Sequence, residues 1–230
     1  MIITTWNLKH GGGKRIKEIV RVLSENTDTD IFVFTEYRNN SNKEYLSLKL
    51  NELGYVYQYN PKSEPNENSV LVASKIKFKS KIFSNLNSHK HRVIKVFNNE
   101  YAIYGCYFPL KNLKKELFEF LMDEVHENKE NLIIIGDFNT GKHFIDEKNK
   151  TFYCSEYFEE LEQKEMIDAW RLSNSQKKEF SWYNNAVNGF RLDHIFISSY
   201  LKNKVKQCEY IHTYREEKIS DHSMMKLEIE

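Results

Sequence analysis

The chain has 230 residues, of which 40% are hydrophobic and 14% aromatic, so it can bury a sizeable core and is not intrinsically disordered. Its 34 basic and 33 acidic side chains leave a formal net charge of +1, which implies no global attraction to nucleic acid. No apolar run reaches the roughly 18 residues of a membrane-spanning helix, and no secretory leader is visible. With only three, widely spaced cysteines, we expect one cytoplasmic domain over residues 1–230 and no membrane partner; nothing points to a protein partner.

Short runs of β-branched and aromatic residues predict eight strands. In chain order they are Ile2–Leu8, Ile31–Thr35, Ser69–Ala73, Arg92–Phe97, Tyr101–Phe108, Leu132–Ile135, Leu192–Ser198 and Met224–Ile229. Apolar residues at helical spacing predict helices around residues 16–23, 113–121 and 157–161, and the polar stretch Asn60–Asn68, with two prolines, predicts a surface loop. Several strands are joined by short turns, which favours antiparallel pairing. We therefore predict an α+β fold with two sheets packed face to face and helices outside.

Basic side chains are concentrated between Val70 and Asn99, where seven Lys and Arg residues occur without one Asp or Glu. Such a surface could contact phosphates. Alternatively, the alternation of lysine and apolar residues over Lys75–Lys79 indicates an edge strand whose lysines block pairing with other chains. We prefer the second interpretation.

Polar side chains stand where the predicted strands begin or end. They are Asn7, Glu36, Asp137, Asn139, Asp193, Asp221 and His222. If these strand ends converge, carboxylates, amides and an imidazole meet in one place. Such oxygen ligands without thiolates favour Mg²⁺, or Mn²⁺, over zinc. The site would suit phosphoryl chemistry, because a metal neutralises charge on the phosphate while a carboxylate and a His activate water.

Each of these residues, taken singly, also has an ordinary structural explanation. An Asp or Asn after a strand is usually a turn residue or a helix cap. His222 could be a buried histidine with satisfied hydrogen bonds, and Tyr107 and Trp182 could serve packing alone. Coincidence at five strand ends is less expected than at one, so we interpret them as a site, although spacing alone does not prove that they meet.

Six motifs resemble, in order, those of the endonuclease/exonuclease/phosphatase superfamily. They are Trp6-Asn7, Thr35-Glu36, Tyr107-Phe108-Pro109, Gly136-Asp137-Phe138-Asn139, Arg191-Leu192-Asp193 and Ser220-Asp221-His222. The segments 167–171 and 180–183 are similar to the branch of exonuclease III and the abasic-site endonucleases. The resemblance covers residues 2–229 and implies a four-layer αββα sandwich of two mostly antiparallel sheets, with the site at one end of the sheets.

The resemblance implies a Mg²⁺ cofactor, with Mn²⁺ as the alternative, and a set of ligands. Glu36 would be the main metal ligand, helped by Asn7, with Asp221 in a second metal position. Two positions after the first Asn, the abasic-site enzymes usually carry an acidic residue or an amide, whereas this chain has Lys9. A lysine there would compete with a metal or contact a phosphate.

The resemblance also implies catalytic roles. Asp137 would orient or deprotonate the attacking water, and Asn139 would hold that water or the phosphate. His222 would contact the scissile phosphate, with Asp193 fixing its tautomer and favouring its cationic form. Tyr107 would hydrogen-bond the phosphate or stabilise the leaving oxygen. Asp137 and the Asp193–His222 pair are both placed to accept the proton, so the general base stays open.

Four further residues are expected to bind substrate, namely Lys9, Lys14, Arg92 and Trp182. The glycine run Gly11–Gly13 beside them lacks the second half of a nucleotide-binding P-loop. It could be a flexible turn into the first helix or a loop that contacts phosphate.

Three functions follow, in order of preference. The first is a metal-dependent phosphodiesterase that cleaves nucleic acid, DNA rather than RNA, as an exonuclease or abasic-site endonuclease. The second is an enzyme for a nucleotide or other small phosphoester, favoured by short segments before Asp137 and Trp182 and by Leu110 where the branch has an amide. The third is a non-catalytic binding module, which the complete set of ligands and acid–base residues argues against.

Overall fold

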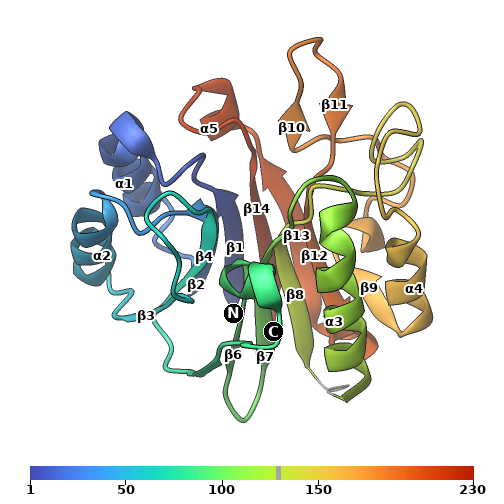
Figure 1. The fold of residues 1–230 in the computed structure, drawn as a ribbon, viewed down its shortest axis with the longest axis horizontal. Coiled ribbons are helices and arrows are strands. Elements are labelled where there is room, and N and C mark those ends of the chain that lie inside the picture. Colours follow the sequence, from blue (N-terminus) through green and yellow to red (C-terminus); the bar gives the residue numbers. More distant parts are fainter. Residues whose placement is uncertain (128–130) are drawn as a thin grey trace.

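The computed structural model describes residues 1–127 and 131–230, and it has four layers in the order helix, sheet, sheet, helix (Figure 1). The first sheet contains β1 (Ile2–Asn7), β2 (Ile31–Tyr37), β3 (Tyr57–Tyr59), β4 (Ser69–Ser74), β13 (Val205–Ile211) and β14 (Met224–Ile229). The second contains β5 (Lys79–Lys81), β6 (Val93–Phe97), β7 (Ala102–Tyr107), β8 (Leu132–Asp137), β9 (Met166–Asp168) and β12 (Asp193–Ser198). The strand orders are β13-β14-β1-β2-β4-β3 and β5-β6-β7-β8-β12-β9.

Helices cover the outer faces of both sheets. α1 (Ile16–Glu25) and α2 (Lys43–Glu52) lie on the first sheet, and α3 (Lys115–Glu127) and α4 (Tyr157–Gln163) lie on the second (Figure 1). The short helix α5 (Thr213–Glu216) and the hairpin of β10 (Trp182–Tyr183) and β11 (Gly189–Phe190) lie at one end of the sheets, at the top of Figure 1. In the two sheets only β1–β2 and β7–β8 pair in parallel among the described strands. The predicted sandwich of mostly antiparallel sheets is confirmed.

Three hydrophobic clusters fill the three spaces between the layers. Alternate residues of one strand belong to different clusters: Ile31 and Val33 pack between the sheets, whereas Phe32 and Phe34 pack under α1 and α2. In β8 the isoleucines likewise divide between the inner cluster and the cluster under α3 and α4. Because both faces of these strands are buried, they are apolar throughout instead of alternating with polar residues.

All eight predicted strands are present, with ends that differ by one or two residues, and so are the three predicted helices. The sequence did not predict the helices α2 and α5, the short 3-10 helices, or the strands β3, β5, β9, β10, β11 and β13. In α2, Leu46 and Leu50 are buried while Leu48 is exposed, so leucines occur on two faces and blur the helical period. β13 is an edge strand with mixed polar and apolar exposure, and it lacks the apolar run that marks a central strand.

The strand predicted at Lys75–Lys79 is wrong over most of its length. β4 ends at Ser74, and β5 begins at Lys79 in the other sheet. The backbone between them must therefore cross from one sheet to the other, and it is held by the Tyr59 hydroxyl, which bonds both the N–H and the carbonyl of Phe78. The edge position of β5 agrees with the idea of lysines that block pairing.

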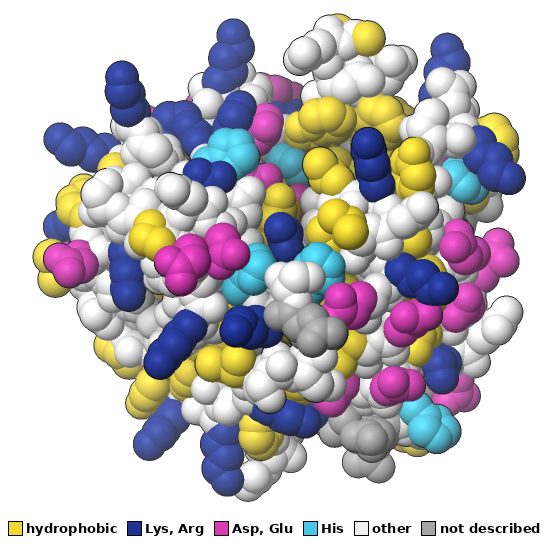
Figure 2. Space-filling model, in the orientation of Figure 1, with side chains coloured by type: hydrophobic (Ala, Val, Ile, Leu, Met, Phe, Trp, Pro, Cys, Tyr) yellow, Lys and Arg dark blue, Asp and Glu magenta, His cyan; other side chains and the backbone are white. Residues whose placement is uncertain are grey.

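Charge is unevenly divided over the surface. The acidic side chains of α3 and α4 gather on the right of Figure 2, whereas lysines and arginines are more frequent on the left. Two lysines of the predicted basic stretch form ion pairs within the protein, since Lys81 and Lys95 lie 3.6 and 3.8 Å from the carboxylate of Glu124. Within the described residues, no helix combines the length and apolarity needed to cross a bilayer. All three cysteines are buried and unpaired.

Candidate active site

The strand ends converge at the end of the sandwich that carries α5 and the β10–β11 hairpin. Asp137 closes β8 and pairs directly with Asp193, which opens β12. Asp193 accepts a hydrogen bond from the His222 ring, with 2.8 Å between its Oδ2 and Nδ1. Side-chain atoms of Asp137, Asp193 and His222 all lie within 4.8 Å of one another. Asn7, at the end of β1, joins the two sheets because its Nδ2 donates to Asp137 Oδ2 over 3.0 Å.

Local backbone geometry fixes the carboxylate of Asp137. The preceding Gly136 has φ +147°, and a Cβ there would lie 1.9 Å from the carbonyl oxygen of Cys106, so only glycine fits. After Asp137 the chain turns at Asn139, which has φ 51°. The N–H of Asn139 donates to Asp137 Oδ1 over 2.9 Å, and its side-chain amide donates to the Phe108 carbonyl over 2.8 Å. The motif is thus an Asx turn that orients the carboxylate.

Burial and neighbouring charge set the protonation of these groups. Burial raises the pKa of Asp137 well above its ordinary value, and the nearby carboxylate of Asp193 adds to the rise while His222 opposes it. Burial alone would lower the pKa of His222, but the carboxylates of Asp193 and Asp137 raise it well above its ordinary value. His222 is therefore a cation at neutral pH, next to a carboxylate that holds a proton readily. This pairing suits acid–base chemistry.

Glu36 lies on the other side of the site, in an irregular part of β2. The pairing of β2 with β4 shifts register between Phe34 and Tyr37, and Glu36 has φ 50°. Its Oε1 accepts from the Tyr107 hydroxyl over 3.3 Å, and its Oε2 lies 3.0 Å from Nδ1 of the His10 ring. Among the described residues, His10 is the only basic side chain within ion-pair distance of this carboxylate. The bulge thus turns an acidic side chain towards Tyr107 and leaves it without a Lys or Arg partner.

The glycine-rich run forms a turn around the predicted metal ligands. Five successive residues, Lys9 to Gly13, have φ between 50° and 79°. The N–H of Lys9 donates to Asn7 Oδ1 over 2.8 Å, and that of His10 donates to Glu36 Oε2 over 2.9 Å. The next two amides bond the carbonyls of Glu36 and Leu8. These four N–H groups are used within the protein, so they orient the predicted ligands and are not free to bind a phosphate.

Asp221 is held by a lysine. Lys9 Nζ lies 3.4 Å from Asp221 Oδ2. The preceding Ser220 donates from its hydroxyl to the Asn7 carbonyl over 2.6 Å and accepts from the N–H of His222 over 3.1 Å. The segment before β14 is therefore fixed to the end of β1. The role of Asp221 in a second metal position stays a prediction, and the ammonium group beside it weighs against that role.

The residues expected to bind substrate differ in their placement. The guanidinium of Arg92 lies 4.9 Å from the centre of the Tyr107 ring, and two of its nitrogens are buried without a hydrogen-bond partner among the described residues. Trp182 forms an isolated β-bridge with His222, and their rings are 6.4 Å apart. Among the described residues, no hydrogen bond or ion pair joins Lys14 to another site residue, whereas the adjacent Arg15 donates to the carbonyls of Lys9 and Ile219.

Sequence reasoning missed three residues that support the site. Asn68 donates to the Tyr107 hydroxyl over 3.3 Å and accepts from Arg38 over 2.5 Å. Lys114 is almost fully buried and donates to the Asn139 carbonyl over 2.5 Å. Burial lowers the pKa of Lys114 to about 8 although Asp137 opposes the shift. Arg15 joins the glycine-rich turn to the residue before Ser220. Nothing in their spacing marks these three residues, because each acts through a contact distant in sequence.

The donor set around Glu36 fits a hard divalent cation. Glu36 supplies a carboxylate without a Lys or Arg partner, and Asn7 supplies an amide oxygen with one hydrogen bond among the described residues. No thiolate lies in the motifs that form the site, and the three cysteines are buried elsewhere. Oxygen donors of this kind are those that Mg²⁺ and Mn²⁺ prefer.

A four-layer sandwich with a carboxylate, amide and imidazole cluster at one end has the groups that phosphoester hydrolysis needs. The model of the Endonuclease/Exonuclease/phosphatase family matches residues 4–222, so the chain belongs to this family.

Solved structures share the fold. The 3′ phosphatase NExo from Neisseria, bound to a product DNA hairpin, aligns with a TM-score of 0.85 at 21% identity over 100% of this chain and 99% of that one. The 3′–5′ exonuclease NExo from Neisseria meningitidis gives 0.83 at 22% identity over 100% of both chains. An AP endonuclease from Archaeoglobus fulgidus gives 0.78 at 17% identity over 100% of this chain and 99% of that one. At these identities the likeness shows the fold.

Proposed function

We propose that the protein is a divalent-metal-dependent phosphodiesterase that hydrolyses nucleic acid, DNA rather than RNA, as an exonuclease or abasic-site endonuclease. The observation that carries the proposal is the convergence of Asp137, Asp193 and His222 within 4.8 Å beside Asn7. An acid–base cluster next to oxygen donors matches the needs of phosphodiester hydrolysis. The AP endonuclease and NExo structures support a nucleic-acid substrate by the activities in their names.

In this proposal the scissile phosphate lies between His222 and Tyr107. His222, as a cation paired with Asp193, donates a hydrogen bond to a phosphate oxygen. Asp137 orients the attacking water and takes its proton. The raised pKa of Asp137 favours this transfer, because a carboxylate with a higher pKa binds the proton more strongly. The Tyr107 hydroxyl donates to a phosphate or leaving oxygen, and burial together with Glu36 raises its pKa, so it stays protonated.

Glu36 and Asn7 would hold the metal ion. A bound Mg²⁺ would supply positive charge that offsets the negative charge developing on the phosphate and leaving oxygens. Arg92, which has two buried nitrogens without a hydrogen-bond partner in the described part of the chain, would bind a phosphate oxygen beside Tyr107. Trp182 would pack against the sugar or base next to the scissile bond, since it borders His222.

A second candidate is hydrolysis of a phosphomonoester or other small phosphoester at the same site. The net charge of +1 and the acidic surface of α3 and α4 offer no general attraction to a duplex. The hairpin between β10 and β11 is also short, with only residues 184–188 between its strands. The 3′ phosphatase among the solved structures supports this candidate by its name.

The deciding experiment uses an end-labelled duplex with one abasic site, incubated with Mg²⁺ or with EDTA. We expect Mg²⁺-dependent cutting that an Asp137→Ala variant lacks. Product lengths then separate incision at the abasic site from digestion at the ends. An uncut duplex, with release of phosphate from a 3′-phosphorylated oligonucleotide, would favour the second candidate. No turnover of either substrate would overturn both.

Glu36→Gln should raise the Mg²⁺ concentration for half-maximal activity by at least about tenfold, because even groups that only orient a ligand typically change metal affinity by about 10–100-fold. Calorimetric titration with Mn²⁺ should show the same loss without relying on turnover. Glu44→Gln, which changes an exposed side chain in the first turn of α2, is the matched control and should not change either value. Unchanged Mn²⁺ affinity in Glu36→Gln would contradict the assignment of the ligand.

A further inference from the structure

A pocket lies beside the acid–base cluster, on the side of α5. It has a volume of about 340 Å³ and is lined by Lys9, Tyr183, Arg215, Lys218, Ser220 and Asp221. Three of these side chains are cationic and one is a carboxylate, so the lining carries an excess of two positive charges. None of the mechanistic roles above uses Arg215 or Lys218.

The contacts of these cations leave charge free for a ligand. Lys9 lies beside Asp221. Arg215 donates to the Phe180 carbonyl over 2.6 Å and stacks 4.7 Å from the Tyr183 ring centre, but it has no carboxylate partner within 4 Å among the described residues. The same holds for Lys218. Two cations beside a pocket without a matching carboxylate favour an anion.

The acidic residues nearest in sequence do not cancel this charge. Glu216 and Glu217 belong to α5 and its C-terminal end, yet neither lines the pocket. Glu217 pairs with Arg21 over 3.0 Å instead. Lys218 follows in the left-handed conformation, with φ 62°, a position after a helix that glycine usually takes. The excess positive charge of the pocket therefore comes from Lys218 and Arg215.

The pocket borders the segment that carries His222, the residue proposed to contact the scissile phosphate. Ser220 and Asp221 directly precede His222, and the Ser220 hydroxyl accepts from the His222 backbone N–H. Tyr183, which also lines the pocket, follows Trp182, and Trp182 is bridged to His222. A group bound here would therefore lie close to the residue proposed to contact the reacting phosphate.

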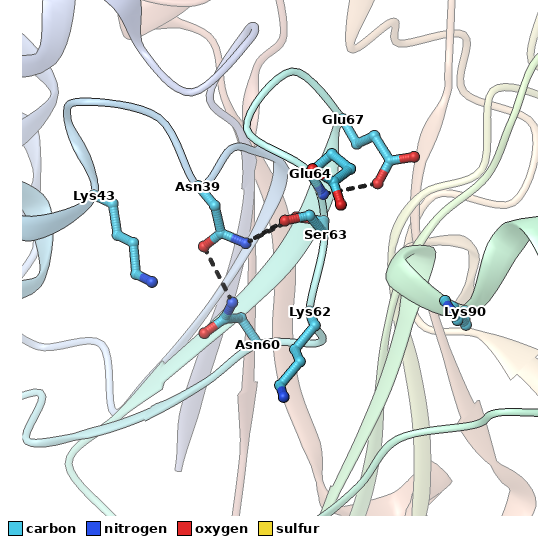
Figure 3. Close-up of a pocket in the computed structure, with 8 residues that line it drawn as sticks. All are labelled: Asn39, Lys43, Asn60, Lys62, Ser63, Glu64, Glu67 and Lys90. Carbon is cyan, nitrogen blue, oxygen red and sulfur yellow. Dashed lines mark hydrogen bonds between the residues drawn. The ribbon is translucent and has the colours of Figure 1, made fainter.

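A larger pocket of about 710 Å³ on the other side of the site fits this role less well. It is lined by Asn39, Lys43, Asn60, Lys62, Ser63, Glu64, Glu67 and Lys90 (Figure 3). In Figure 3, Lys43 and Lys90 lie on opposite sides of a hydrogen-bonded group of Asn39, Asn60 and Ser63, and Lys62 lies beside that group. Two glutamates offset two of its three lysines, and no member of the acid–base cluster lines it.

We infer that the pocket formed by Lys9, Tyr183, Arg215 and Lys218 binds the phosphate group of the nucleotide next to the scissile bond. Arg215 and Lys218 contact that phosphate, and the Tyr183 ring packs against the attached sugar or base. The inference rests on the proposed action on nucleic acid. It makes the enzyme favour substrates with a second phosphate over those with only the reacting one.

The test measures binding of a labelled single-stranded oligonucleotide to Asp137→Asn protein, which should cut the substrate about 10²–10⁴-fold more slowly than the unchanged protein. Adding Lys218→Asn removes the charge and keeps a residue that tolerates positive φ. We expect several-fold weaker binding and a fall of about 0.7 in the slope of log K against log salt for one lost phosphate contact. Arg215→Gln should act in the same direction. Lys202→Asn removes an exposed charge at the far end of the sheets and should change neither value.

A competition experiment locates the second phosphate. A dinucleoside monophosphate is compared with the same compound carrying an extra phosphate at its 5′ or its 3′ end. One of the two extra phosphates should make the compound a better competitor for oligonucleotide binding to Asp137→Asn protein, but not to the protein that also carries Lys218→Asn. The end that carries the effective phosphate gives the direction in which the strand is bound. If Lys218→Asn and Arg215→Gln bind like Lys202→Asn, the inference is wrong while the proposed function stands. If the protein without substitutions neither bound nor cut nucleic acid, the proposed function would be overturned.

Discussion

Asp137→Asn should lower turnover by about 10²–10⁴ while the protein stays folded, because that is the usual contribution of a positioned general base. The amide keeps the shape of the side chain and one acceptor oxygen. It can therefore still accept from either Asn7 or the N–H of Asn139, which donate to the two carboxylate oxygens over 3.0 and 2.9 Å. It cannot take a proton from water. The loss should thus appear in turnover more than in substrate affinity.

Steady-state kinetics and denaturation of the same preparation check this result. Asp123→Asn, which changes an exposed residue of α3, is the matched control and should leave turnover unchanged. Full activity of Asp137→Asn with the fold intact would show that the base is another group, and the pair of Asp193 and His222 would be the next candidate. His222→Gln would then have to lose more activity than Asp137→Asn.

The central strands, and two packed sheets with helices outside, could be predicted from sequence because their signals are local, whereas the four-layer αββα sandwich was implied by the resemblance of the motifs. Buried runs such as Leu132–Ile135 indicate a strand from their own composition. The residues of such runs then form much of the three buried clusters. The motifs at the strand ends indicated which residues meet, and the structure brings Asn7, Asp137, Asp193 and His222 together. Their catalytic roles stay predictions, as do the single domain over 1–230 and the cytoplasmic location.

What the sequence could not indicate depends on contacts between distant segments. The orientation of Glu36 follows from a bulge in β2 and from the amides of the glycine-rich turn, and no pattern of apolar residues encodes either. The Lys9–Asp221 pair joins residues more than 200 positions apart. The short strands β3, β9 and β10 have only two or three residues each, so their pairing partners define them more than their composition does.

A buried network of charges behind the site is a further feature of this kind. Arg191 is fully buried and donates from Nε to Asp146 Oδ1 over 2.7 Å and from Nη2 to the other oxygen over 3.2 Å. The same guanidinium donates to both oxygens of Asp168 and stacks 5.2 Å from the Trp170 ring centre. Arg171 adds a second cation to Asp146. Because Asp193 lies two residues after Arg191, this network anchors the strand that carries the hydrogen-bond partner of His222.

Arg191→Met should destabilise the fold by about 3–5 kcal/mol, because removing one partner from a buried ion pair leaves uncompensated charge. Burial alone would raise the pKa of Asp168, but Arg191 lowers it far below the ordinary range, and Arg191 likewise helps to lower the pKa of Asp146. Carboxylates with lowered pKa values stabilise the fold above about pH 4 and lose that contribution as the pH falls through their folded pKa. The difference in free energy of unfolding between the unchanged protein and Arg191→Met should therefore be largest at pH 7 and should become smaller below about pH 4.

Urea denaturation at several pH values measures this difference. Arg21→Met is the charge-matched control, since it removes an exposed arginine that pairs with Glu25 and Glu217, and we expect it to leave stability essentially unchanged. If Arg191→Met were as stable as Arg21→Met, the network would not hold the fold together. A large loss that did not narrow at low pH would instead indicate that packing of the long side chain against Trp170, and not its charge, carries the stabilisation, because packing does not depend on the protonation of Asp146 and Asp168.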